Sequence, residues 1–213
     1  MKAHCFIYLI IYSCFIMSVS LQAQEHFADR YNVSYITMDD GLPHNFIDDI
    51  YKDTRGFLWI STAGGGLSRY DGYEFIHFNP NTPHSKLKSN FIHNVYEDRF
   101  HRLWIVSEGG TDIIDLSTLQ SVIPNDPKGL LPRFINHPTY IVILDSQGCI
   151  WLQCDNALHR ITFDAEGGID TLSTLDLPEQ DEPDLILKDI DEDGKIWTGI
   201  NGTIYKITPT PQG

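Results

Sequence analysis

Four tryptophans recur through the chain at nearly equal intervals. Trp59, Trp104, Trp151 and Trp197 are separated by 45, 47 and 46 residues. A period of about 40–50 residues is typical of repeat architectures, in which each unit is one supersecondary structure. Such an array requires other positions to recur in the same register. An aspartate stands six residues before each tryptophan: Asp53, Asp98, Asp145 and Asp191. A leucine or isoleucine stands directly before it: Leu58, Leu103, Ile150 and Ile196. In three units a glycine stands three residues before it: Gly56, Gly148 and Gly194.

Each unit follows the same local order. A β-rich run leads into a tight turn built on the aspartate, then into the tryptophan strand, a second turn and a third strand. The tryptophan segments read DTRGFLWIST, DRFHRLWIVS, DSQGCIWLQC and DEDGKIWTGI. Aspartate and glycine suit a short hairpin, because glycine accepts positive φ and aspartate caps its own turn. His101 replaces the glycine in the second unit, which predicts a different turn type there.

The period and the grouping of strands predict an all-β fold. We expect a β-propeller of about four blades that form part of a larger, incomplete ring, with units centred on the four tryptophans within residues 25–213. Blades pack face to face, so inner strands should be apolar almost continuously, as FLWI and IVIL are. The tryptophans are then packing residues between blades, and burial of one ring contributes on the order of 3 kcal/mol. Ligand stacking is the alternative role for these rings.

The N-terminus has the pattern of a secretory signal peptide, predicted over residues 1–24. Lys2 is followed by the apolar run CFIYLIIYSCFIMSV, and no further charged residue appears before Glu25. Small residues allow cleavage after Ser20 or Ala23. The alternative is an uncleaved membrane anchor, since the run is near the lower length limit of a span.

The charge of the exported part is strongly negative. Loss of Lys2 leaves 14 basic residues against 29 acidic ones, a formal charge of −15. This balance argues against nucleic acid and anionic membrane surfaces as partners, although a local basic pocket can still exist. Cys149 and Cys154 are five residues apart on one predicted strand, about 16 Å, and are expected to be packed core thiols that do not bridge.

Other motifs are weak. Asp189 to Gly194 matches the first half of a calcium loop but lacks the glutamate that such a loop needs at its twelfth position, so an acidic turn is the simpler interpretation. Gly64, Gly65 and Gly66 are expected to form a hairpin turn, because no helix or Lys-Ser/Thr pair follows them. The sequence shows no catalytic constellation, no cofactor motif and no metal-ligand spacing among its histidines, so we expect no catalytic, cofactor or metal site.

Two groups of residues are alternative candidates for function. Four aromatic residues could form a sugar-stacking surface, but alternate spacing places Tyr73 and Phe75 in an outer strand: Tyr70, Tyr73, Phe75 and Phe78. Asp48 and Asp49 are the carboxylate pair that an enzyme on a propeller would use at the start of an inner strand. As neighbours in a strand they face opposite ways, which makes them poor acid–base partners.

Residues 41–78 resemble the two-component regulator propeller repeat. The unit of that family reads GL-x-x-N, a β run, D-x-x-G-x-L/I-W-I-G-T, a glycine-rich turn and L-x-R/K-Y/F-D. Ser61 stands at the position where the family prefers glycine. The second unit keeps Ser89, Asn90, Asp98, Leu103, Trp104 and Ile105, while the third and fourth are more degenerate. The resemblance covers about residues 25–207 and rests in the first unit on these matches: Gly41, Leu42, Asn45, Asp53, Gly56, Leu58, Trp59, Ile60, Thr62, Gly66, Leu67, Tyr70 and Asp71.

The resemblance implies a non-enzymatic periplasmic sensor. Propellers of this family are sensing parts of Bacteroidetes hybrid two-component systems that respond to glycan fragments, so it implies an oligosaccharide ligand. It also implies downstream modules that this chain lacks: a second propeller, an immunoglobulin-like domain, a membrane helix and a histidine kinase. A freestanding secreted carbohydrate-binding propeller and a truncated gene remnant are the alternatives.

An incomplete ring leaves one blade face uncovered, which favours poor solubility or a homodimer. Residues 27–38, FADRYNVSYITM, are predicted to form a strand ahead of the first unit.

Overall fold

The computed structural model describes residues 32–83, 86–154, 157–176, 186–191, 195–200 and 203–208. The chain divides into two compact units, residues 1–36 and 37–213, and all the strands described below belong to the second. The predicted signal peptide lies outside the described residues. Within the described residues, no helix has the length and apolarity needed to cross a membrane.

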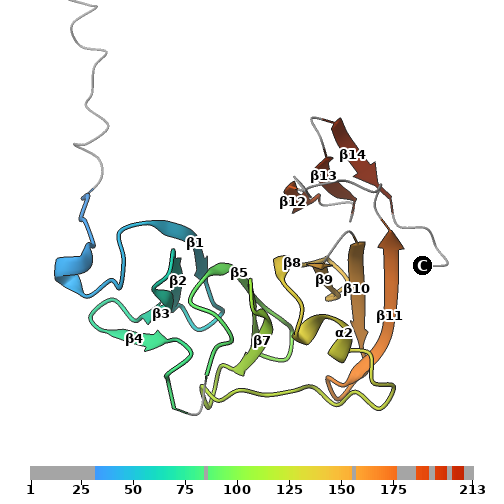
Figure 1. Ribbon diagram of the computed structural model, residues 1–213, viewed down its shortest axis with the longest axis horizontal. Helices are drawn as coiled ribbons and strands as arrows, with labels where there is room; N and C mark the ends of the chain where they lie inside the picture. Colours follow the sequence, from blue (N-terminus) through green and yellow to red (C-terminus); the bar gives the residue numbers. More distant parts are fainter. Residues whose placement is uncertain are drawn as a thin grey trace, which may run out of the picture. The chain divides into compact units, whose positions relative to one another are not determined.

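Four antiparallel sheets follow one another along the chain (Figure 1), and in each sheet neighbouring strands are neighbours in sequence. This confirms the predicted all-β fold with four repeated units. Two short helical segments accompany the sheets, the 3-10 helix η3 (Met38–Asp40) and α2 (Pro132–Ile135). The strands are β1 (Ile47–Lys52), β2 (Leu58–Thr62), β3 (Gly66–Tyr70) and β4 (Phe75–Phe78); β5 (Ile92–Glu97), β6 (Arg102–Ser107) and β7 (Gly110–Asp115); β8 (Thr139–Leu144), β9 (Ile150–Cys154), β10 (Ala157–Phe163) and β11 (Ile169–Asp176); β12 (Ile186–Ile190), β13 (Ile196–Ile200) and β14 (Thr203–Ile207).

The second sheet lacks a full fourth strand. Beyond β7 the chain returns as a single bridge between Ile114 and Ser121, and the Val122 amide donates to the Ile113 carbonyl. A segment therefore pairs with β7 at the place of the fourth strand, but it is too short to be a strand.

The predicted strand over residues 27–38 is wrong for the residues described. Residues 32–37 have no regular structure, and η3 begins at Met38. The Thr37 amide donates to Asp40 Oδ2 at 2.8 Å, and Thr37 Oγ1 accepts from the Asp39 amide at 3.2 Å. These reciprocal bonds form a capping box, which commits the segment to a helical turn instead of a strand.

The tryptophan strands of the second and third blades are buried along their whole length. Every residue of β6 and β9 is buried, whereas β1 alternates between half-buried and exposed residues. A strand covered on both faces by neighbouring sheets needs apolar residues at successive positions, which explains the unbroken runs in the sequence.

Three of the four tryptophans lie in the cores between successive sheets. Trp59 packs with Ile92, Val95 and Leu103 of the second sheet, and Trp104 packs with residues of the third, including Val142, Ile150 and Leu152. Trp151 packs with Ile196 of the fourth sheet. Trp59 and Trp104 are 0% exposed, Trp151 8% and Trp197 37%. Trp59, Trp104 and Trp151 therefore each serve the junction between their own blade and the next.

The cysteines take the place expected of core thiols. Cys149 and Cys154 are buried and are not joined in a disulfide bond. Burial raises the pKa of the Cys149 thiol, so it stays protonated at neutral pH.

Candidate functional site

One hydrogen bond explains the six-residue spacing between aspartate and tryptophan. In every unit the indole Nε1 donates to the aspartate Oδ2, at 2.8, 2.8, 3.0 and 2.9 Å along the chain. The other carboxylate oxygen accepts backbone amides of the turn, as Asp53 Oδ1 does from Arg55 and Phe57. The aspartate thus closes the hairpin and satisfies the indole N–H, which would otherwise be buried without a partner.

The predicted difference in the second turn is wrong. His101 adopts a left-handed φ of 58°, where Gly56 and Gly148 have φ of 93° and 78°. The His101 amide donates to the Asp98 carbonyl at 3.1 Å, as the Gly56 amide does to Asp53 at 3.0 Å. Histidine is one of the residues that tolerate this region, so the turn keeps its form without glycine.

Backbone strain at His101 gives a first testable prediction. His101→Val is expected to be about 1–2 kcal/mol less stable than His101→Gly, because a β-branched side chain is disfavoured at positive φ whereas glycine is not. Both variants lose the imidazole, so urea unfolding of the pair isolates the backbone contribution. Equal stabilities would show that the turn relaxes away from the left-handed conformation.

A buried glutamate joins the first two hairpins. The side chain of Glu97 is 2% exposed and accepts from the Thr54 amide and the Thr54 hydroxyl, each at 2.7 Å, and His101 Nδ1 lies 2.8 Å from it. Burial alone raises the pKa of Glu97, but the bonds from Thr54 and His101 outweigh it and hold this pKa below its ordinary value. The ionised carboxylate therefore fixes the two turns side by side.

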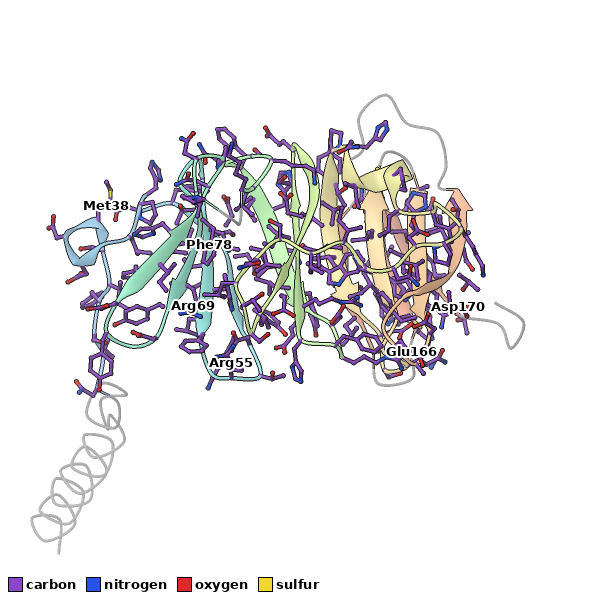
Figure 2. All side chains as sticks on the ribbon, turned by 90° about the horizontal axis from the view of Figure 1, so that it is seen from below. Met38, Arg55, Arg69, Phe78, Glu166 and Asp170 are labelled. Carbon is purple, nitrogen blue, oxygen red and sulfur yellow. The ribbon has the colours of Figure 1, made fainter. Side chains whose placement is uncertain are left out.

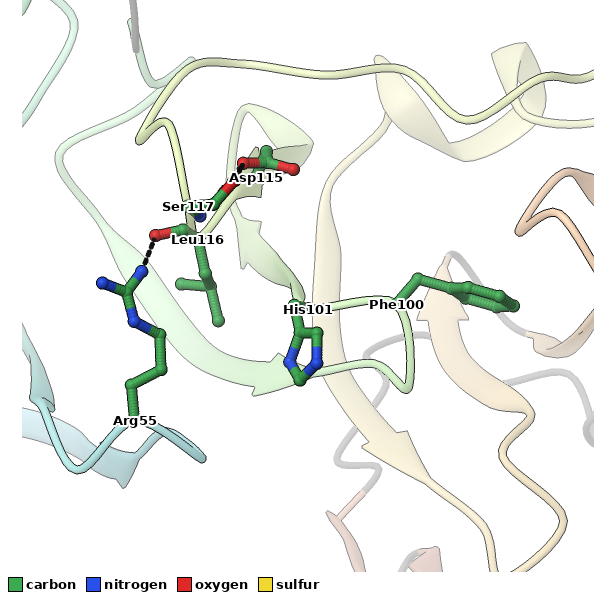
Figure 3. A pocket seen from close by; sticks show the side chains of 6 residues that line it. All are labelled: Arg55, Phe100, His101, Asp115, Leu116 and Ser117. Atoms are coloured by element: carbon green, nitrogen blue, oxygen red, sulfur yellow. Dashed lines mark hydrogen bonds between the residues drawn. The ribbon is translucent and has the colours of Figure 1, made fainter.

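A pocket of about 380 Å³ lies beside this junction. It is lined by Arg55 of the first hairpin, by Phe100 and His101 of the second, and by Asp115, Leu116 and Ser117 at the end of β7 (Figure 3). The Arg55 guanidinium donates to the Leu116 carbonyl, which ties the first hairpin to the far side of the pocket. Three segments from two blades thus meet in one concave site.

The lining offers both hydrogen-bond donors and acceptors. Asp115 Oδ1 accepts from the amides of Ser117 and Thr118, at 3.0 and 2.8 Å. The Ser117 hydroxyl, helped by these amides, lowers the pKa of Asp115, so its carboxylate is ionised at neutral pH. An ionised acceptor, a guanidinium and a hydroxyl around one concavity suit an uncharged ligand with several hydroxyl groups.

The aromatic candidates do not form one surface. Phe78 is 2% exposed, with its ring centroid 5.3 Å from that of Trp59, so it belongs to the core. Tyr70 stacks on Phe75 at 4.5 Å, whereas Tyr73 is 91% exposed in the turn before β4. The assignment of Phe75 to an outer strand is confirmed and that of Tyr73 is wrong. In the first sheet, Phe78 and Arg55 lie towards opposite ends of the strands (Figure 2).

The glycine triplet forms the hairpin turn expected between β2 and β3. Gly66 has φ of 81° and its amide donates to the Asn90 carbonyl of the next unit at 3.0 Å. A Cβ at Gly65 would meet Thr62 Oγ1 at 2.3 Å, so the turn packs too closely for a side chain.

The carboxylate pair at the start of β1 is separated as expected. Asp48 is exposed, whereas Asp49 is half-buried and accepts from the Val95 amide at 3.2 Å. In the partial calcium motif, residues 192–194 lie outside the described residues. No group of three or more potential metal ligands occurs in the part of the chain that the structure describes.

The pocket residues stand at the variable positions of the repeat. Arg55 and Phe100 both lie four residues before their tryptophan, and Gln147 holds that position in the third unit. Internal repeats thus contain a signal for the site: side chains that differ between units within an otherwise constant turn. The sequence alone left the ligand-binding residues unassigned.

Comparison with known proteins gives the repeat a family. Residues 41–64 and 86–109 each match the two-component regulator propeller family. These matches confirm the resemblance within the first two units. No curated protein matches the chain significantly.

Solved structures confirm the β-propeller fold. An extracellular domain from B. thetaiotaomicron, assigned as a hybrid two-component system, is 24% identical with a TM-score of 0.56, and the alignment covers 80% of this chain and 24% of that one. A structure of an extracellular domain assigned as a one-component system from this bacterium is 27% identical, with a TM-score of 0.55 and coverage of 79% and 23%. Another hybrid two-component system of the bacterium gives 20% identity, a TM-score of 0.54 and coverage of 82% and 30%. The chain thus spans less than a third of the length of these proteins.

Proposed function

We propose that this chain is the periplasmic sensing part of a two-component signalling system and that its ligand is a glycan fragment. The observation that carries the proposal is the position of the pocket. Arg55 belongs to the first matched repeat and His101 to the second. The family likeness and the concave polar site therefore coincide in the same two blades. The extracellular location of the similar domains supports export by residues 1–24, with the propeller in residues 25–213.

The chemistry of the pocket favours a neutral sugar. Sugar hydroxyls can donate to the Asp115 carboxylate and to the Ser117 hydroxyl oxygen, and can accept from Arg55. The formal charge of −14 for the whole chain disfavours polyanionic ligands at long range. Because the pocket is shared by two blades, a bound ligand favours one relative arrangement of them, and this bias is what downstream modules would transmit.

The test is calorimetric titration of the purified chain with a panel of neutral oligosaccharides. We expect at least one to bind, and Asp115→Ala to weaken that binding by about tenfold or more, because a charge-assisted hydrogen bond is lost. The matched control is Asp71→Ala. Asp71 closes the equivalent turn of the first blade through the amides of Tyr73 and Glu74, outside the pocket. Equal binding by the two variants, or no binding by the wild type, would contradict the proposal.

A freestanding carbohydrate-binding propeller remains the second candidate. It is favoured by one observation, that all the pocket residues belong to this chain. The two functions differ in what binding does: only the sensor requires that a kinase fused downstream respond to the same sugar.

A further inference from the structure

The first strands of three blades carry the same irregularity. Pairing with the tryptophan strand skips one residue in β1, β5 and β8, and the skipped residues are Asp48, His93 and Tyr140. Each stands eleven residues before its tryptophan. A β-bulge redirects the side chain of the extra residue, and bulges are over-represented beside functional sites. These three residues lie at the strand ends opposite to the aspartate turns, so they are separate from the pocket described above.

The three bulges bring different chemical groups together. The rings of His93 and Tyr140 lie with their centroids 5.3 Å apart. The charges of Glu108 and Asp48 both act on the His93 imidazole, but burial outweighs them and lowers the pKa of His93, so the ring is neutral at neutral pH. Asp48 and Glu108 are exposed, and Tyr140 is 37% exposed. An imidazole, a phenol and two carboxylates therefore share one end of the blades.

Unmet hydrogen-bonding capacity concentrates at the same place. In the described part of the chain, seven buried side-chain polar atoms make no hydrogen bond to another protein group, and His93 Nε2 and Asn90 Oδ1 are two of them. Three more belong to residues that flank the bulges on the partner strands: Ser61, Thr62 and Gln153. Buried polar atoms without partners are rare in folded proteins, so their concentration distinguishes this end of the blades from the rest of the described structure.

We propose that this bulge site, formed by Asp48, His93, Glu108 and Tyr140, binds a protonated primary amine. An ammonium group has three N–H donors and a positive charge. The carboxylates of Asp48 and Glu108 offset that charge and accept its N–H groups, and the Tyr140 ring contributes a cation–π contact. The negative charge of the chain raises the local concentration of cations and so favours encounter. This site is independent of the glycan pocket and takes a ligand of different charge.

The experiment uses three sugars that differ at one group. Glucosamine carries the amine, N-acetylglucosamine has it neutralised by acetylation, and glucose has a hydroxyl in its place. In calorimetric titrations of the full chain at low salt, glucosamine is expected to bind at least about tenfold more tightly than the other two sugars. Its affinity is expected to fall as the salt concentration is raised. Equal binding of the three sugars would overturn the proposal.

Variants locate the binding. Asp48→Asn and Glu108→Gln are exposed, nearly isosteric changes, and each is expected to weaken glucosamine binding by about fivefold or more. Glu166→Gln is the matched control, since Glu166 is an exposed acid in the turn between β10 and β11, at the other end of the blades. Glucosamine binding that falls equally in Glu166→Gln and Asp48→Asn would show non-specific ion pairing and contradict the proposal.

Discussion

Replacement of Trp104 by alanine is expected to lower the free energy of unfolding by about 3–5 kcal/mol. The ring is 0% exposed and packs between the second and third sheets, beside Val142, Ile150 and Phe163. Its removal opens a cavity that the surrounding side chains cannot easily fill. It also leaves Asp98 Oδ2 without its indole donor. Urea unfolding followed by circular dichroism measures the change.

Trp197→Ala is the matched control for this loss. Trp197 makes the same bond to its aspartate, at 2.9 Å, but its ring is 37% exposed. Its removal is expected to cost less, about 2 kcal/mol, because more of its apolar surface remains in water than in the case of Trp104. Losses of similar size for Trp104 and Trp197 would show that the hydrogen bond, and not packing between blades, is what the tryptophan contributes.

Replacement of Asp98 by alanine is the second large effect, about 3–5 kcal/mol. The carboxylate of Asp98 is fully buried and lies 2.7 Å from Arg102 Nε, and the Arg102 side chain is itself almost entirely buried. Breaking a buried pair by removing one partner leaves a charge without compensation. The same change also removes the acceptor for the amides of Phe100 and Arg102.

The control for Asp98 is Asp164→Ala. Asp164 closes a turn of the same form between β10 and β11, accepting from the amides of Glu166 and Gly168, but no tryptophan stands six residues after it. Loss of these bonds is expected to cost about 1–2 kcal/mol in the same unfolding experiment. If Asp98→Ala costs no more than Asp164→Ala, the buried ion pair does not stabilise the second blade as described.

Much of the fold could be predicted because the repeat fixes it locally. An aspartate, a turn and a tryptophan strand in a constant register specify the hairpin, and continuous apolar runs specify strands covered on both faces. Two of the wrong predictions have local causes. His101 takes a left-handed conformation that sequence rules reserve mainly for glycine, and Thr37 with Asp40 forms a capping box inside a segment with strand-like composition.

The site was less accessible to sequence reasoning. Arg55 and Asp115 are 60 positions apart and meet only because adjacent blades place one turn beside another. Aromatic spacing suggested a sugar-stacking surface formed by Tyr70, Tyr73, Phe75 and Phe78. In the structure Phe78 is buried in the core and Tyr73 is exposed to solvent. The bulges that redirect Asp48, His93 and Tyr140 are features of strand register, which periodicity alone does not reveal.

The most direct test of the sensor assignment is amide hydrogen exchange of the full chain with and without the oligosaccharide that binds best. The account predicts slower exchange in residues 54–57, 99–102 and 115–118, the three segments that meet at the pocket, because a ligand held by two blades stabilises their closed arrangement. Protection confined to other segments, or no protection at saturating sugar, would contradict the account.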